Sequence, residues 1–162
     1  MVTNATGSEY GANASYNGRV MVSGNATTIS TLSGVGAQAF QYGSVTVGGD
    51  AIGDNGAYTG LGGSITISGN AIGFYRGVYA NGEGPGSTIE VGGNVTATGE
   101  TGIGAQAYNA GKITINGEIN APIYIRVGSI DKAATEYTEP TTKAGYRTFT
   151  DGTSSTVWVK IP

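Results

Sequence analysis

The side chains that could do acid–base chemistry are few in this sequence. It contains no cysteine and no histidine, which excludes thiol chemistry, disulfides, the usual zinc sites and any mechanism that needs an imidazole. Catalysis by carboxylates needs acids that converge on one face beside a base. Asp50 fits a repeated structural row better than a catalytic site, so Asp54 is left without a partner and we expect no catalytic residues. The acids and bases of the repetitive part of the chain include Asp50, Asp54, Glu90, Glu118, Arg76 and Lys112.

The run Asp54-Asn55-Gly56 could begin a calcium site. However, the spaced oxygen ligands that follow in an EF-hand loop are missing here. The chemistry of tight turns accounts for Asp, Asn and Gly in succession without any ion. We therefore expect no metal and no cofactor.

A second kind of chemistry is offered by aromatic rings and amides that recur at similar intervals. Tyrosine rings can stack on the apolar faces of sugars, while amides pair with sugar hydroxyls, so this set predicts a glycan-binding face. The alternative is that an exposed tyrosine is simply a good strand former and that the amides stack on one another. The residues concerned, each in the same place of a repeated Gly-x-x-x segment, are Asn13, Gln38, Tyr58, Tyr79 and Gln106.

One motif recurs five times and indicates the elements that must position these residues. Each copy alternates β-branched residues, then ends in Gly and a polar residue, which is typical of a short strand followed by a sharp turn. The copies begin 25, 20, 24 and 24 residues apart at Val20, Val45, Ile65, Ile89 and Ile113. A second apolar segment follows each turn, and a third, rich in Gly and Ala, precedes each motif. We therefore predict about five coils with three strands each.

A unit this short cannot bury its own apolar side, so the coils must stack, with equivalent strands paired in parallel about 4.8 Å apart. Alternation sends the Val and Ile side chains inward and the residue between them to solvent. The polar residue after each turn then forms a structural ladder of Asn25, Asp50, Asn70 and Asn94. The fold class is thus an all-β, single-stranded parallel β-helix.

The glycine repeat stops after residue 127, which divides the chain into coils at 1–127 and a C-terminal segment at 128–162. Two strands, at 146–150 and 157–160, flank the turn signal Asp151-Gly152 and predict a β-hairpin that caps the solenoid. At the other end, residues 1–7 resemble residues 94–99, so we expect that the chain begins within a coil. We expect a segment of a longer protein, with upstream coils of the same parent chain as a stacking partner.

The Val/Ile-x-Val/Ile-x-Gly-Asn motif and the polar ladder resemble right-handed parallel β-helices, the pectin-lyase-like fold. Polysaccharide lyases, adhesin passenger domains and carbohydrate-binding proteins of bacteria share that fold, and the resemblance covers residues 2 to about 127. It implies right-handed coils and a secreted or cell-surface location. The tail at 145–160 is similar to segments that close repeats in large surface proteins of Gram-positive bacteria.

The composition excludes several partners. Charged residues make up 12% of the chain and the net charge of −3 is spread along it, so the clustered Lys and Arg that bind nucleic acid are absent. No stretch approaches the roughly 20 apolar residues of a membrane span, and we expect no membrane insertion. The leading hypothesis is a non-catalytic adhesin or stalk that binds a polysaccharide or a cell-surface glycan. A lyase-like or hydrolase-like fragment and a purely structural spacer are the alternatives.

Overall fold

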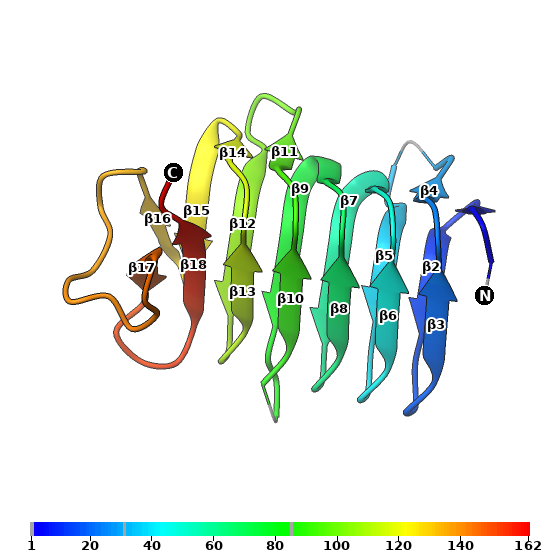
Figure 1. The fold of residues 1–162 in the computed structure, drawn as a ribbon, viewed down its shortest axis with the longest axis horizontal. Coiled ribbons are helices and arrows are strands. Elements are labelled where there is room, and N and C mark those ends of the chain that lie inside the picture. Colours follow the sequence, from blue (N-terminus) through cyan, green and yellow to red (C-terminus); the bar gives the residue numbers. More distant parts are fainter. Residues whose placement is uncertain (1, 31, 85) are drawn as a thin grey trace.

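The computed structural model describes residues 2–30, 32–84 and 86–162. Over these residues the chain is an all-β solenoid of about five turns, and they contain no helix. None of them forms a helix that is long and apolar enough to cross a membrane. The turns stack side by side along the long axis, and the C-terminal hairpins lie at the end opposite the N-terminus (Figure 1). The predicted parallel solenoid is therefore confirmed.

The five copies of the sequence motif form one sheet, which we call sheet A. Five of its strands pair in parallel, so that Val20, Val45, Ile65, Ile89 and Ile113 fall in one register row. Two strands of the C-terminal segment complete the sheet. Its strands are β3 (Arg19–Val22), β6 (Ser44–Val47), β8 (Ser64–Ile67), β10 (Thr88–Val91), β13 (Lys112–Ile115), β17 (Tyr146–Thr150) and β18 (Thr156–Lys160).

The remaining strands form the second sheet, sheet B. In two turns the segments after and before the motif run together as one long strand, β7 or β9, and a register shift between Gly53 and Asn55 marks the corner. The strands of sheet B are β1 (Ala5–Gly7), β2 (Tyr10–Ala14), β4 (Ala26–Thr28), β5 (Val35–Ala39), β7 (Ala51–Gly60), β9 (Ala71–Asn81), β11 (Val95–Ala97), β12 (Ile103–Tyr108), β14 (Ile119–Asn120), β15 (Ile123–Val127) and β16 (Ile130–Lys132).

The core lies between the two sheets and consists of stacked rows of like residues. Sheet A contributes the Val and Ile side chains, while sheet B contributes mainly alanines such as Ala37, Ala57 and Ala105, all fully buried. Because the buried side chains of sheet B are small, the backbones of sheets A and B can approach closely. Each buried Val or Ile contributes roughly 1.5–3 kcal/mol.

The polar residues after the turns are joined by hydrogen bonds from one turn to the next. The Asn25 Oδ1 atom accepts a bond from the backbone N–H of Asp50 at 2.9 Å, and Asp50 Oδ1 accepts one from Asn70 at 2.7 Å. Asn70 and Asn94 continue the series in the same direction. Each side chain thereby satisfies a backbone donor that the tight turn leaves without a strand partner.

The C-terminal segment forms two antiparallel pairs. Strand β16 folds back on β15, and β17 pairs with β18, which confirms the predicted hairpin. The sequence did not predict the second partner of β18, which also pairs in parallel with β13 and acts as one more rung of sheet A. Val157 and Val159 extend the buried rows, and Trp158 stands on the outer face beside Thr114.

The loops that lead into sheet A contain pairs of consecutive residues with positive φ. One is Asn109-Ala110, with φ of 46° and 68°. Positive φ at two successive residues is the geometry of type I′ turns, which favour Gly and Asn. The other three pairs are Tyr16-Asn17, Gln41-Tyr42 and Leu61-Gly62.

We expect Ala110→Gly to raise the free energy of unfolding by about 0.5 kcal/mol. Glycine removes the cost of a left-handed conformation at this position. Part of that gain is lost because glycine also raises the conformational entropy of the unfolded chain. Urea denaturation followed by circular dichroism measures the change. The matched control is Ala144→Gly, at an exposed site without positive φ, which should lower stability; a decrease of the same size in both variants would contradict the turn argument.

Candidate functional site

The acids and bases of the coils do not converge. Asp54 is 6% exposed, and its Oδ2 atom accepts a hydrogen bond from the Gly34 N–H at 2.9 Å, so it closes a corner of sheet B. Asp50 belongs to the ladder, whereas Glu90 lies on the outer face of sheet A. Among the residues that the structure describes, no group of three or more acidic side chains could hold a metal ion.

The predicted aromatic and amide residues lie together on the outer face of sheet B. Register pairs link them one to the next across strands β2, β5, β7, β9 and β12, and we call this set the tyrosine row. The row comprises Asn13, Gln38, Tyr58, Tyr79 and Gln106. Arg126 on β15 and Asp131 on β16 continue it.

Tyr58 and Tyr79 form the centre of the tyrosine row. Their rings are stacked with centroids 5.0 Å apart and planes 10° apart, and the edge of Phe40 meets Tyr58 at 5.4 Å. Burial raises the pKa of both phenols, so both hydroxyls stay protonated at neutral pH. Because these ring faces contact one another, the row offers mainly ring edges and hydroxyl groups to a ligand. This differs from the sequence expectation that sugars stack on open tyrosine faces.

Arg76 contacts the tyrosine row from one side. Its guanidinium lies 4.9 Å from the Tyr79 ring centroid, and its Nε donates to Gln106 Oε1 at 2.6 Å. A weaker bond of 3.4 Å joins Nη1 to Asn55 Oδ1. These contacts fix the orientation of the Gln106 amide and keep a positive charge beside the aromatic stack.

An open hollow of about 320 Å³ lies at the C-terminal end of the row. It is lined by Tyr79, Gln106, Tyr108 and Arg126 with the adjoining loop at residues 128–129. The Tyr108 side chain is 41% exposed and so can contact a ligand. Arg126 is held by a bidentate ion pair with Asp131, which lowers the pKa of that carboxyl through hydrogen bonding.

Sequence reasoning missed Arg76, Tyr108 and Arg126 as members of this face. A signal existed for Arg126, which follows Gln106 by 20 residues and alternates with the buried Ile125 and Val127. No comparable signal existed for Arg76, because its place depends on the corner irregularity of β9.

The fold and the row together define a β-solenoid protein with an aromatic and amide face on one sheet. Comparison with protein-family models, with curated proteins and with solved structures gives no match for the chain.

Proposed function

We propose that the chain is a non-catalytic segment of a secreted or cell-surface bacterial protein, that it serves as an adhesin or stalk, and that its tyrosine row binds glycans. The observation that carries the proposal is the stacked Tyr58–Tyr79 pair, set in a row of amides on an outer face. A polysaccharide that lies along the solenoid axis would meet phenol hydroxyls, amide groups and ring edges in turn. Sugars need this mixture of apolar contact and hydrogen bonding.

The hollow beside Tyr79 gives this face a place for one sugar residue. Tyr108 offers an exposed ring there, and Gln106 and Arg126 supply donors fixed by their own partners. Donors that are already oriented lose little conformational entropy on binding. We place the strongest contacts of the glycan in this hollow.

We further propose that the coils are right-handed and have three strand segments per turn, as in the pectin-lyase-like fold. Parallel strands in one sheet are joined by right-handed crossovers in about 98% of known cases. The corner near Gly53, which divides the long strand β7 by a register shift, supports separate second and third segments. A crystal structure would test both statements.

Removing the two central rings should weaken glycan binding. We expect the double variant Tyr58→Ala/Tyr79→Ala to lose roughly 10-fold in affinity for any glycan that the native chain binds on a glycan array, since two aromatic contacts disappear. The matched control is Tyr16→Ala/Tyr42→Ala, which removes two exposed tyrosines from the turns.

The outcomes separate the alternatives. Full retention of binding by the double variant would exclude the tyrosine row as the binding face. Absence of binding to every glycan tested would favour a spacer. Release of unsaturated products from a polyuronate in the presence of Ca²⁺ would contradict the non-catalytic assignment.

A further inference from the structure

The outer face of sheet A contains a hollow of about 170 Å³ that is separate from the tyrosine row. Its principal walls come from one row of side chains that runs across the strands β8, β10, β13 and β18. In this row Thr66, Glu90, Thr114 and Trp158 are successive register partners. Lys112 lies on β13 two residues before Thr114. The lining is completed by Ser64, Ile65, Thr88 and Ile89.

The hollow exists because a short side chain stands between two long ones. Thr114 separates Glu90 from Trp158 on consecutive strands, so the two larger groups are two strand spacings apart, about 9.6 Å. A gap of this width is wide enough for one sugar ring beside Thr114, whose Oγ1 atom is bonded by Lys143 Nζ. On sheet B the rings of Tyr58 and Tyr79, which are one strand spacing apart, stack at 5.0 Å, so a ring one spacing from Trp158 would also be at stacking distance.

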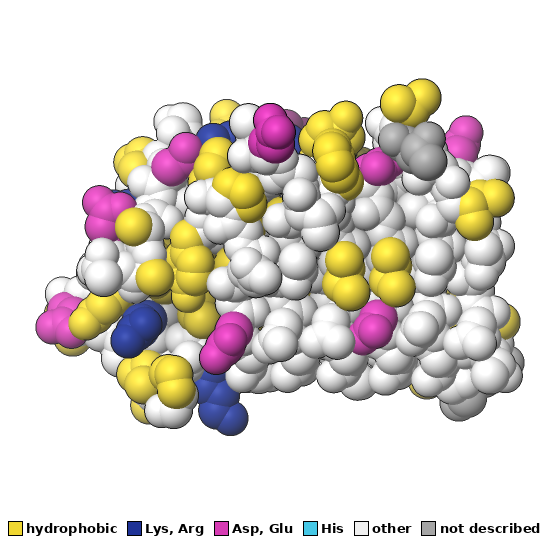
Figure 2. Space-filling model, turned by 90° about the horizontal axis from the view of Figure 1, so that it is seen from above, with side chains coloured by type: hydrophobic (Ala, Val, Ile, Leu, Met, Phe, Trp, Pro, Cys, Tyr) yellow, Lys and Arg dark blue, Asp and Glu magenta, His cyan; other side chains and the backbone are white. Residues whose placement is uncertain are grey.

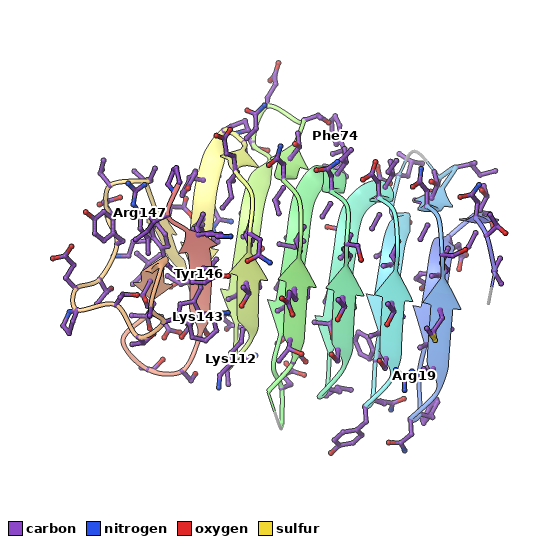
Figure 3. All side chains as sticks on the ribbon, in the orientation of Figure 1. Arg19, Phe74, Lys112, Lys143, Tyr146 and Arg147 are labelled. Carbon is purple, nitrogen blue, oxygen red and sulfur yellow. The ribbon has the colours of Figure 1, made fainter. Side chains whose placement is uncertain are left out.

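The indole wall of this hollow is held in place. Trp158 Nε1 donates a hydrogen bond to Thr142 Oγ1 at 2.9 Å. Lys143 lies 5.6 Å from the indole centroid and 4.4 Å from the ring centroid of Tyr146, and its Nζ donates to Thr114 Oγ1 at 3.1 Å. Figure 3 shows Lys143 and Tyr146 over β18 and Lys112 at the lower end of β13. The wall is therefore ordered before a ligand arrives.

Charged side chains surround the gap. Glu90 and Lys112 are exposed on adjacent strands, and within the described part of the chain neither side chain makes a hydrogen bond or an ion pair. A carboxylate that can accept and an ammonium group that can donate thus flank an aromatic wall. Lys143 adds a second cation at the other end of Thr114.

We infer that this hollow binds one pyranose ring of a sugar. The ring would lie beside Thr114 and the Lys143 ammonium group, with its apolar face toward Trp158. Its hydroxyls would donate to Glu90 and accept from Lys112. The site uses no residue of the tyrosine row and lies on the other sheet, so it does not depend on the proposed function of that row. A chain with both sites would hold a glycan at two separate faces.

Trp158 is the only tryptophan of the chain, so its fluorescence reports on this hollow alone. The probes are methyl β-D-glucopyranoside, methyl β-D-galactopyranoside and N-acetylglucosamine, each titrated into the native protein. We expect a saturable change in emission with at least one of them, with a Kd of roughly 1–10 mM, as is usual for a ligand of this size. Glu90→Gln and Lys112→Met should each weaken binding about 10-fold, because each removes a charge-assisted hydrogen bond.

Matched controls are Glu118→Gln and Lys160→Met, which change the same residue types outside the hollow and should keep the native Kd. The Tyr58→Ala/Tyr79→Ala variant should also keep it; loss of the response there would assign the sugar to the tyrosine row and overturn the inference. The inference also fails if none of the three sugars gives a saturable change up to about 100 mM, ten times the weakest expected Kd. Native affinity in both Glu90→Gln and Lys112→Met would overturn it as well.

Discussion

Gly56→Ala should lower the free energy of unfolding by about 3 kcal/mol, because a methyl group at this position has no room. Gly56 is buried in β7, just after the corner at which the two segments of this long strand meet. A Cβ atom there would stand 2.5 Å from the Gly77 carbonyl oxygen and 2.7 Å from the Ile72 amide nitrogen. Both neighbours are backbone atoms of the next turn, so neither can rotate away. The strands must move apart, and the parallel hydrogen bonds on both sides are strained. Urea denaturation followed by circular dichroism measures the loss.

The control for this variant is Gly86→Ala. Gly86 is exposed, and its added Cβ would meet only the Ala110 carbonyl oxygen, at 3.0 Å. We expect a change within about 0.5 kcal/mol, as for most surface substitutions. If both variants were equally stable, the close approach of the turns at Gly56 would be wrong.

Phe149→Ala should cost about 3–5 kcal/mol, the usual range for removing a buried phenylalanine ring. Phe149 is 0% exposed and lies on β17, with its ring 5.9 Å from Tyr124 and 6.4 Å from Tyr137. The ring therefore joins the C-terminal segment to the last coil. We expect circular dichroism and Trp158 fluorescence to show the loss at the same urea concentration, because β18 is a strand of both hairpin and solenoid.

An exposed phenylalanine provides the comparison. Phe74 is 48% exposed at a corner of β9, where it contacts Tyr75 edge to face (Figure 3). Phe74→Ala should cost less than about 1 kcal/mol. A fluorescence transition in Phe149→Ala that precedes the circular dichroism transition would show that the C-terminal segment unfolds separately from the coils.

The sequence was sufficient to predict the solenoid because its information is periodic. Five copies of one strand motif define the register of sheet A, since a slip by one residue would turn every Val and Ile outward. The same alternation placed Tyr58 and Tyr79 on an outer face. On the same sheet the structure pairs Ile52 and Ile72 in register on adjacent turns, with both side chains half-buried. Figure 2 shows isolated apolar side chains of this kind among polar surface.

The features that the sequence did not predict lie where the period ends. Strand β18 has the right alternation to join sheet A, but it begins 44 residues after β13 instead of about 24 and lacks the Gly-Asn turn. Alternation alone does not identify a partner strand. For this reason the sequence shows the row of Thr66, Glu90 and Thr114 only as ordinary solvent-exposed residues of a strand. The aromatic wall at Trp158 exists only once β18 is in place.

The double pairing of β18 has a mechanical consequence when the C-terminus is pulled. A force that pulls on the C-terminus reaches β18 before any coil. This strand is hydrogen-bonded along one edge to β13 and along the other to β17, so two rows of bonds must break before it leaves. The bonds to β13 pass the load to the last coil, so that coil is held at its outer edge by β18. The last strand is thus a latch at the end of the solenoid, and its strength should determine the force at which the molecule begins to unravel.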